Sequence, residues 1–393
     1  MTTKPPISLA RRCIRAAKDT WLLNPLRRWI IKRKQRQYIE ACDAHFRRLV
    51  IFLVPGYDII SGGIMSIISI SDETDKILSS HDTDIFVCSL PGEPPLLRYT
   101  KFINKAFLCD FQMVISRCDK DANLLIHIPE DYVSQFIRHG LDQLKQYKSL
   151  KYNFNIMLQN IDYIPHKIDI DILKDIGSIS VTTAHKAYAD SRVEELFGCK
   201  LWHLSTFVSP EQYEYRSYEN KKNIVIVSPD YHHNRSKILE SLMSVLHEYE
   251  FIVVRKMTYQ QYKSLIAEAK FSLTFGEGLD GYFVEPIFSG GIGCAVFNER
   301  FFTESYRNLP CMYSSWEELI EMLPRDIKAL NNQVKYTQAH LTQFNLLASN
   351  YSYQEYQRNL DDFYRERFPI SHSNGVKDLK NCMDSIGMLS RIK

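Results

Sequence analysis

The segment Phe271–Val296 holds the residues whose types and spacing are best suited to chemistry. It reads FSLTFGEGLDGYFVEPIFSGGIGCAV, an apolar run that leads into a glycine-rich turn and then into a short helical stretch. Glycines at a strand-to-helix turn let the backbone approach a ligand closely, and the start of the helix offers free N–H groups to a phosphate. The segment therefore predicts a phosphate-binding turn flanked by two carboxylates, Glu277 in the turn and Glu285 on the helix.

The eight-residue separation of Glu277 and Glu285 carries little information by itself, because short motifs of this kind recur by chance. The same separation occurs twice more in the chain, in the pairs Glu211/Glu219 and Glu240/Glu248. One of these pairs lies in a polar linker and the other on an ordinary helix. Only Glu277 and Glu285 join a glycine-rich strand end to the helix after it. This context favours a functional role over the alternative of a turn residue and a helix-surface carboxylate.

A second glycine turn occurs in the N-terminal half, within the sequence VPGYDIISGGI. The apolar run Leu49–Val54 ends at Pro55, and Gly62 and Gly63 open the next helical pattern. A glycine turn is again placed against a helix start, which suits an anionic ligand. A simple strand-to-helix turn is the alternative interpretation.

These residues need strands and helices to position them, and the chain has the rhythm of a doubly wound α/β protein. Short, continuous apolar runs are typical of buried parallel strands, and here they alternate with helical patterns. In the first half the expected strands are Leu49–Val54, Ile85–Leu90, Phe111–Ser116, Asn123–Ile128, Phe154–Leu158 and Ile176–Val181, and the expected helices include Ile64–Asp75, Glu130–Tyr147 and Ala184–Phe197.

The same rhythm restarts after a polar, aperiodic stretch. Expected strands at Asn223–Ser228, Glu250–Arg255, Phe271–Phe275 and Gly293–Phe297 alternate with helices over 234–248, 258–269 and 282–289, and the chain from 315 is mostly helical. We therefore predict a basic amphipathic arm (1–45), a Rossmann-like domain (46–207), a linker (208–222), a second Rossmann-like domain (223–349), and a C-terminal helix and tail (350–393). Two such sheets bind a ligand between them, at the carboxyl ends of their strands.

The glycine-rich segment resembles the E-x7-E region of retaining, nucleotide-sugar-dependent glycosyltransferases of the GT-B fold, the group 1 type. The close resemblance covers about 221–298. It implies an N-terminal acceptor domain and a C-terminal donor domain that face each other across a cleft. It also implies that Glu277 contacts the donor sugar and that Glu285 holds the nucleotide ribose. The amides expected to face the donor diphosphate belong to Gly278, Leu279, Asp280, Gly281 and Tyr282.

The resemblance assigns further residues outside this segment. Gly62 and Gly63 would approach the donor diphosphate, and His127, at the end of an expected strand in LLIHIPEDY, would lie near the donor sugar; His185 is the competitor for this role. Arg235 and Lys237 are the candidates for the Arg and Lys that neutralise the diphosphate, with Lys256 as a substitute for either. The usual spacing of that pair is not kept. For each cation a solvated position is the alternative, and for each histidine a capping or core role.

The chemistry implied is the cleavage of a sugar–nucleotide bond through an oxocarbenium-like state. Fixed amides, helix dipoles and cations can stabilise the negative charge on the leaving diphosphate without a metal. The acceptor hydroxyl would attack from the same face, so the anomeric configuration is retained and the leaving phosphate takes the proton. No cofactor is expected, because the nucleotide sugar is a substrate. The acceptor is expected to be a glycan or a lipid-linked glycan in surface polysaccharide biosynthesis.

The charge of the chain is distributed unevenly. Residues 1–48 hold 13 Lys and Arg and three acidic side chains, a net charge of +10, whereas the remaining residues carry −7. Trp21 and Trp29 lie among the cations, a combination that predicts an interfacial helix on anionic lipid. A solvated tail, a helix packed on the acidic body, or RNA binding by the arm are the alternatives. Nucleic-acid binding by the whole surface is not expected.

The composition and cysteines indicate an intracellular globular protein. Hydrophobic residues make up 45% and charged residues 24%, and the nine cysteines form no CxxC pair, which is typical of reduced thiols. Arginines interrupt the first apolar stretch, so no secretory signal is expected. Glycines and a proline interrupt the apolar run 49–71, which favours strand, loop and helix over a membrane span. The expected location is cytoplasmic, with possible peripheral contact with the membrane.

Three other functions remain open. A metal-dependent transferase would need a DxD triplet after a strand, and only Asp119/Asp121 has that expected placement among Asp82/Asp84, Asp119/Asp121 and Asp169/Asp171. Another GT-B enzyme, such as an epimerase or a phosphorylase, would share the fold. A non-catalytic scaffold would keep nucleotide binding without turnover.

The pair His232–His233 lacks a surrounding Cys or carboxylate cluster, so no metal site is predicted there.

Overall fold

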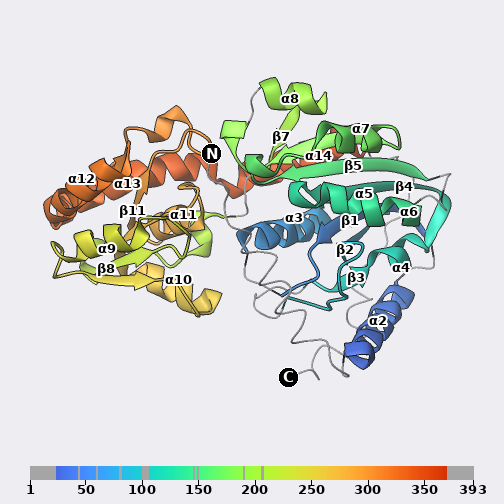
Figure 1. Cartoon of the computed structure of the whole chain (residues 1–393), viewed down its shortest axis with the longest axis horizontal. Coiled ribbons are helices and arrows are strands. Elements are labelled where there is room, and N and C mark those ends of the chain that lie inside the picture. The colour runs from blue at the N-terminus through green and yellow to red at the C-terminus, as the bar shows by residue number, and fades with distance from the viewer. Residues whose placement is uncertain are drawn as a thin grey trace.

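A computed structural model describes residues 24–42, 45–58, 61–78, 82–99, 106–144, 147, 150–188, 191–204 and 208–369. Residues 1–23 of the predicted arm, with Trp21, and the predicted tail from residue 370 lie outside the described residues. The chain forms two α/β lobes, and its last described helix returns from the second lobe to the first (Figure 1). The prediction of two tandem doubly wound sheets is confirmed.

The N-terminal sheet has seven strands in the order β3-β2-β1-β4-β5-β6-β7. All neighbours pair in parallel. The order reverses beside β1, which makes the carboxyl ends of β1 and β4 the switch point where α/β sheets hold ligands. The strands are β1 (Phe46–Val54), β2 (Asp84–Ser89), β3 (Leu108–Asp110), β4 (Cys118–Pro129), β5 (Lys151–Leu158), β6 (Ser178–Thr183) and β7 (Leu201–His203).

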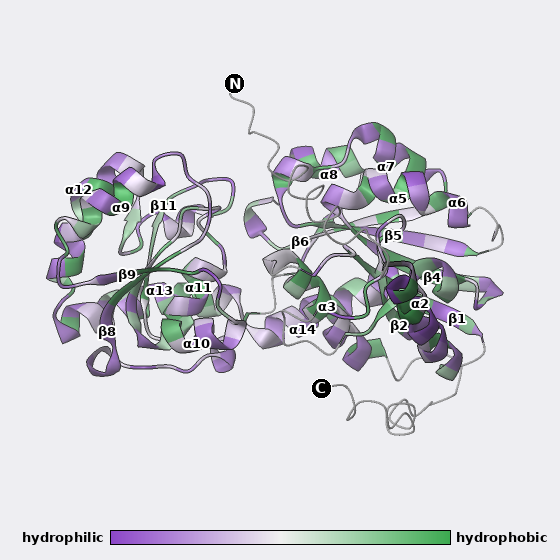
Figure 2. Ribbon diagram, turned by 60° about the horizontal axis from the view of Figure 1, so that its bottom comes forward, coloured by the Kyte–Doolittle hydropathy of each residue, from purple (hydrophilic) through white to green (hydrophobic). Residues whose placement is uncertain are grey.

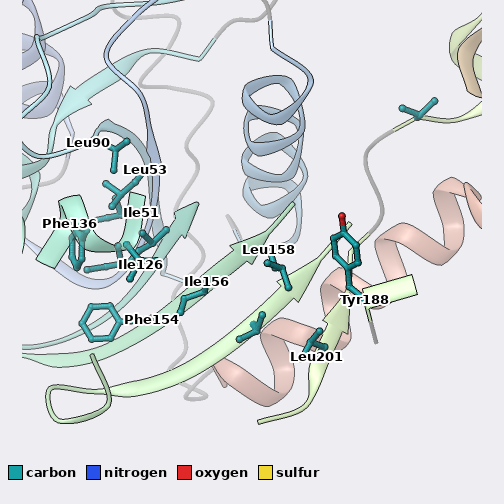
Figure 3. Packing of buried hydrophobic residues seen from close by; sticks show 14 of the residues in the cluster. Ile51, Leu53, Leu90, Ile126, Phe136, Phe154, Ile156, Leu158, Tyr188 and Leu201 are labelled. Atoms are coloured by element: carbon teal, nitrogen blue, oxygen red, sulfur yellow. The ribbon is translucent and has the colours of Figure 1, made fainter. Parts of the chain in front are cut away.

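Both faces of this sheet are covered by helices, which explains the continuous apolar runs. One face carries α3 (Gly62–Leu78) and α14 (Tyr353–Arg367), which pack on each other and bury Val50 and Phe52 of β1. The other face holds the larger cluster, in which Ile51 and Leu53 meet Phe136 and Phe154 (Figure 3). The helices on this side are α4 (Phe111–Ile115), α5 (Val133–His139), α6 (Leu141–Leu144), α7 (Lys167–Lys174) and α8 (Ser191–Phe197).

The C-terminal sheet has five parallel strands in the order β12-β11-β10-β8-β9. Helices α9 and α12 contact each other, and α11 contacts both α10 and α13. The strands are β8 (Lys222–Val227), β9 (Glu250–Val253), β10 (Ala269–Leu273), β11 (Ile292–Val296) and β12 (Met312–Tyr313); the helices are α9 (Arg235–Met243), α10 (Tyr259–Glu268), α11 (Gly281–Phe288), α12 (Trp316–Ala329) and α13 (Gln333–Asn350). Between β7 and β8, the described residues 208–221 contain two short 3-10 helices, η4 (Pro210–Gln212) and η5 (Tyr218–Asn220).

One expected strand is wrong. The run Phe111–Ser116 forms the helix α4, and the strand beside it is β3. Phe111, Val114 and Ile115 are spaced for one helix face and are all buried, while the carboxylate of Asp110 accepts a hydrogen bond from Met113 N and caps the helix. Two expected helices are also interrupted: 130–147 divides into η1 (Glu130–Tyr132), α5 and α6, and 184–197 into η3 (Lys186–Tyr188) and α8.

The apolar run 49–71 forms β1, a loop and α3, as predicted. Within the described part of the chain, no helix combines the length and the apolar character that a membrane crossing requires. Helix α2 (Asn24–Ala41) lies at the β3 edge of the N-terminal sheet (Figure 1). Figure 2 shows that hydrophilic and hydrophobic residues alternate along it. Gln35 anchors it by donating hydrogen bonds to the carbonyl oxygens of Leu108 (2.9 Å) and Leu96 (3.3 Å).

Candidate active site

The glycine-rich turn links β10 to α11 and is shaped by its glycines. Gly278 has a φ of +92°, a conformation that disfavours any side chain. A Cβ at this position would lie 2.5 Å from Cε2 of Phe302, so the turn can pass this ring only with a glycine. The turn ends at Asp280, whose side chain caps α11.

The cap at Asp280 determines which amides a ligand can reach. Oδ1 of Asp280 accepts hydrogen bonds from the amides of Tyr282 (2.8 Å) and Phe283 (3.1 Å). The prediction that the amide of Tyr282 faces a ligand is therefore wrong, because that N–H is already bonded. Among the described residues, the amides of Gly278, Leu279 and Gly281 donate to no acceptor. These unsatisfied donors at the start of α11 are the groups that an anion would use.

Glu285 lies one turn into α11, and its carboxylate reaches back to the helix start, as helical side chains do. An ideal Cβ on Gly281 would lie 2.7 Å from Oε1 of Glu285, so the glycine makes room for the carboxylate. Oε2 accepts a hydrogen bond from the hydroxyl of Tyr259 on α10 at 3.3 Å. The side chain is 6% exposed, and burial raises the pKa of Glu285 to about 7.

Glu277 faces the N-terminal lobe. Its Oε1 accepts a hydrogen bond of 3.0 Å from Nδ2 of Asn160, which follows β5. An ion pair between Arg300 and Asp162 joins the loop after β5 to a third loop, the one after β11. Burial, followed by the nearby Asp230, raises the pKa of Glu277 to about 7. The loops at the carboxyl ends of β5, β10 and β11 thus meet at Glu277.

The loop after β5 also contacts the N-terminal glycine turn. Gln159 donates a hydrogen bond of 3.3 Å to the carbonyl oxygen of Gly63, and a Cβ on Gly63 would lie 2.4 Å from Oε1 of Gln159. Around a Cβ on Gly62, by contrast, there is no atom within 4 Å. Gly63 is therefore a packing glycine, while Gly62 faces open space at the start of α3. Through Gln159 and Asn160 the structure brings the Gly62–Gly63 turn to the same site as Glu277.

A buried carboxylate supports this loop from behind. Oε1 of Glu130 accepts a hydrogen bond of 2.8 Å from the amide of Asn160. Glu130 is 6% exposed, and burial raises its pKa to about 7. The buried Tyr188 has a raised pKa for the same reason, with Glu277 and Glu130 as further causes. Two carboxylates from different lobes therefore converge on one asparagine.

The predicted cations do not converge on the turn. The guanidinium of Arg235 donates to the carbonyl oxygens of Ser228 (2.7 Å), Pro229 and Asp230 (both 3.2 Å), so it braces the loop after β8. Lys237 and Lys256 are exposed and form no ion pair with any described residue. Lys256 has a φ of +52° at the end of β9.

His127 does not face a cleft. It lies within β4, fully buried, with its ring stacked on Phe52 at 4.2 Å and 2° between planes. Its Nε2 is 3.1 Å from the hydroxyl of Tyr364 on α14, and its Nδ1 is 2.9 Å from Nδ2 of Asn155. Burial lowers the pKa of His127 to about 3. The prediction of a catalytic His127 fails because β4 extends two residues past it and α14 covers it.

His185, the competing histidine, follows β6 beside Tyr188, with its ring 5.6 Å from that of Phe301 in the C-terminal lobe. Burial, followed by the neighbouring His203, lowers the pKa of His185 to about 4. It thus lies beside a ring of the C-terminal lobe, and its placement near the donor sugar stays a prediction.

The structure also bears on the alternative of a metal-dependent transferase with a DxD triplet. Asp119 and Asp121 lie in the first half of β4, at its amino end, because that strand begins at Cys118 and not at Asn123. Asp169 and Asp171 lie in α7. A donor-bound cation would need these carboxylates at the carboxyl edge of the sheet. In the described part of the chain, no group of three or more His, Cys, Asp or Glu side chains is arranged to hold a metal ion.

Sequence reasoning missed Asn160, Glu130 and Arg255. Asn160 and Glu130 both follow strands at their carboxyl ends, a signal that could have identified them. Arg255 lies just after β9. Burial is the main cause that lowers the pKa of Arg235, and the nearby charge of Arg255 is the second cause. Arg255 is exposed, so the fold leaves it accessible to a ligand.

The chain was also compared with known proteins. No protein-family model and no curated protein sequence matches it. Among solved structures, sucrose-phosphate synthase from Thermosynechococcus elongatus superposes with a TM-score of 0.52 at 7% identity, covering 83% of this chain and 100% of that chain. Alr3699/HepE from Anabaena, in complex with UDP-glucose, has a TM-score of 0.49 at 8% identity, covering 80% of this chain and 98% of that chain.

The similarity to sucrose-phosphate synthase extends over both lobes of the present chain. It agrees with the two parallel sheets and with the helix α14, which crosses back from the second lobe to pack against α3 and β7. The chain therefore has the GT-B fold.

Proposed function

We propose that this protein is a retaining glycosyltransferase that moves a sugar from a nucleotide-sugar donor to a glycan or lipid-linked acceptor. The observation that carries the proposal is the contact between Asn160 and Glu277. It brings the E-x7-E turn and the Gly62–Gly63 turn, which lie on different sheets, to one site. A fold shared with sucrose-phosphate synthase supports this function by analogy only, since GT-B proteins are recognised by their sites.

The proposed roles follow the geometry. The carboxylate of Glu285, held at the helix start by Gly281 and Tyr259, would accept hydrogen bonds from the ribose hydroxyls. The free amides of Gly278, Leu279 and Gly281 would receive the diphosphate. Glu277 would hold a hydroxyl of the donor sugar, because it is the carboxylate that faces the other lobe. Among the cations, Arg255 and Lys256 replace Arg235 as the candidates for neutralising charge, with Lys237 farther along α9.

The proposed reaction is a displacement at the anomeric carbon. The bond from this carbon to the phosphate oxygen breaks, the acceptor oxygen bonds to the same face, and the acceptor proton passes to the leaving phosphate. Positive charge on the ring and negative charge on the diphosphate develop together. Amides fixed before the reaction stabilise the diphosphate without reorganisation. We propose that this stabilisation suffices without a divalent cation, which activity in excess EDTA would support.

Helix α2 supports a location at an anionic membrane surface. Ile31, Gln35 and Ile39 share one face of the helix and are buried against the protein. The opposite face presents Leu26, Trp29 and Ile30, which are 55%, 57% and 41% exposed. Six Lys and Arg residues surround them: Arg27, Arg28, Lys32, Arg33, Lys34 and Arg36. An apolar stripe ringed by cations suits anionic headgroups, and we propose that it places the enzyme at the cytoplasmic face of a membrane, in surface polysaccharide assembly.

The first experiment is a thermal-shift screen of UDP, GDP, CDP and TDP and their sugar conjugates without metal. A nucleotide that binds the native state raises the melting temperature. We expect one nucleotide series to stabilise the wild type and the Glu248→Ala control, a surface member of a chance pair with the same spacing. Glu285→Ala should lose this shift; Glu285→Gln provides a second test if the alanine variant folds poorly.

Turnover is tested with the donor that this screen identifies. Release of nucleotide together with a sugar or glycoside of the donor's anomeric configuration would support the retaining mechanism. Binding without any hydrolysis or transfer would instead favour a scaffold. A stabilisation that depends on manganese and is unaffected by Glu285→Ala would contradict the proposed site.

A further inference from the structure

A cavity of about 480 Å³ opens beside the proposed donor site, over the carboxyl ends of β10, β11 and β12. One wall is the outer side of the Gly276–Gly278 turn, and the others come from the end of β11 and the start of α12. Cavities of a few hundred Å³ are in the size range of small-ligand sites. We propose that this cavity binds a neutral sugar ring of the acceptor. The proposal rests on the proposed transfer function and extends it to the class of acceptor.

The lining of the cavity is rich in aromatic rings. Phe275 and Trp316 stack with their centroids 4.8 Å apart and an angle of 8° between planes. The ring of His232 lies 4.6 Å from that of Trp316. Phe297 also lines the cavity, with the guanidinium of Arg307 4.0 Å from its ring centroid. Trp316 is only half-buried. A pyranose presents a face of C–H groups, which gains free energy when it is buried against such rings.

Polar groups accompany the rings, as the hydroxyl rim of a sugar requires. Asn298 lines the cavity, and its Oδ1 accepts a hydrogen bond of 3.2 Å from Arg300 N. Its Nδ2 has no acceptor among the described residues, so it can donate to a ligand oxygen. The carboxylate of Glu299, which also lines the cavity, can accept from a hydroxyl.

The charges disfavour an anionic ligand such as a second nucleotide. Arg307, the one Lys or Arg among the lining residues, donates two hydrogen bonds of 2.7 Å to the carboxylate of Glu304. The helix start at α12 carries Glu317 and Glu318, whose pKa values are lowered by hydrogen bonds. These carboxylates oppose the helix dipole that would otherwise attract a phosphate. A neutral ligand is not repelled by these carboxylates.

The position of the cavity links it to the transfer step. Gly276 and Gly278 line it, and Glu277 lies between them with its carboxylate turned to Asn160 on the other side of the turn. A sugar in the cavity would therefore be separated from the proposed donor sugar by one turn of backbone. The acceptor implied is an oligosaccharide, with one ring in the cavity and its reacting hydroxyl at Glu277.

The test measures sugar binding without donor. Saturation-transfer NMR on the full chain would use the methyl glycosides of glucose, galactose, mannose, N-acetylglucosamine and rhamnose, with UDP as an anionic comparison. We expect at least one glycoside to bind the wild type and the Tyr231→Ala control, which removes an exposed ring next to His232. Trp316→Ala and Asn298→Ala should weaken that binding at least fivefold, and Trp316→Leu keeps an apolar side chain in case the alanine variant unfolds.

The outcomes separate this proposal from the proposed function. No binding by any glycoside, or binding that Trp316→Leu and Asn298→Ala leave unchanged, would overturn the sugar site. UDP binding that is lost in Trp316→Ala would show a nucleotide site instead. Failure of nucleotide binding at Glu285, with glycoside binding that depends on Trp316, would leave a sugar-binding protein without the proposed transfer activity.

Discussion

Asn160 donates a hydrogen bond of 3.0 Å from Nδ2 to Oε1 of Glu277, a residue 117 positions later in the chain and on the other sheet. The amide of the same asparagine donates to Glu130 at 2.8 Å. One residue therefore orients a carboxylate of the donor turn and is itself held by a buried carboxylate. This arrangement makes Asn160 a positioning residue for the proposed reaction.

Asn160→Ala is expected to lower kcat/KM for sugar transfer by roughly 10- to 100-fold, the effect of misplacing one reacting group by about 1 Å. The nucleotide-induced thermal shift should be kept, because Asn160 does not contact the proposed nucleotide site. Steady-state kinetics and thermal shift on the same preparations check this. Asn220→Ala, an exposed asparagine near the linker, is the matched control. Equal activity of the two variants would show that the bond to Glu277 has no part in turnover.

Gly281→Ala should reduce nucleotide affinity while leaving the fold intact. The new Cβ would lie 2.7 Å from Oε1 of Glu285, so the carboxylate must move away from the helix start. We expect at least about tenfold weaker binding, about 1.4 kcal/mol, measured by calorimetry. Glu285→Gln combined with Gly281→Ala should add little further loss, since both act on one carboxylate. Additive losses of affinity would show that Gly281→Ala acts through a group other than the carboxylate of Glu285.

Stability without ligand is expected to fall as the pH rises from about 6.5 to 8. Burial raises the pKa values of Glu130, Glu277 and Glu285 from 4.5 to about 7. Below about pH 6.5 the lowered pKa values of His127 and His185 oppose this effect. Above that pH the unfolded histidines are neutral, the buried carboxyls still bind more protons in the native state, and the free energy of unfolding decreases with increasing pH. Urea unfolding across this range measures the slope.

Glu285→Gln removes one of these buried carboxyls, so the difference in unfolding free energy between this variant and the wild type should change by up to roughly 3 kcal/mol between about pH 5 and 8. Glu248→Gln, on the surface, should leave the slope unchanged. A wild-type stability that is level or rises between pH 6.5 and 8 would show that these carboxyls titrate near their ordinary values.

His127→Ala should destabilise the protein without removing the proposed catalysis. The change leaves Tyr364 and Asn155 without buried hydrogen-bond partners and opens a space against Phe52. We expect a loss of about 1–3 kcal/mol in the free energy of unfolding, with kcat/KM per folded molecule changed less than about threefold. Chemical denaturation and kinetics at 15 °C would measure both. A large loss of kcat in a fully folded variant would restore the catalytic role.

Trp29→Glu should reduce binding to anionic vesicles. Full-length protein is expected to float with vesicles of phosphatidylglycerol and phosphatidylcholine, and not with phosphatidylcholine alone, because the cations around the apolar stripe need anionic headgroups. Val334→Glu changes a side chain that is 74% exposed on α13 and serves as the control. Equal flotation of the two variants would exclude α2 as the contact surface, and binding to neutral vesicles would argue against the role of its charge.

The amino-acid sequence by itself determined the architecture. Continuous apolar runs such as LVIFLV in β1 are stable only when both faces of a strand are covered, so the alternation of such runs with helical patterns specified two parallel sheets. The glycines around Glu277 also predicted a close-packed turn from the sequence, because a turn that passes close to a ring or a ligand excludes a Cβ. These features are local, and local spacing is what a single sequence records.

Only the tertiary structure decided which side chains share a site. His127 lies within the apolar run of β4 and Asn160 follows that of β5, yet His127 is covered by α14 and Asn160 contacts Glu277. The sequence predicts that Arg235 neutralises the donor diphosphate, but its guanidinium donates hydrogen bonds to carbonyl oxygens of the loop after β8 instead. The physical reason is that burial and hydrogen-bond partners come from segments far apart in the chain. Contacts between a C-terminal helix and β4, or between two sheets, leave no spacing pattern in the sequence.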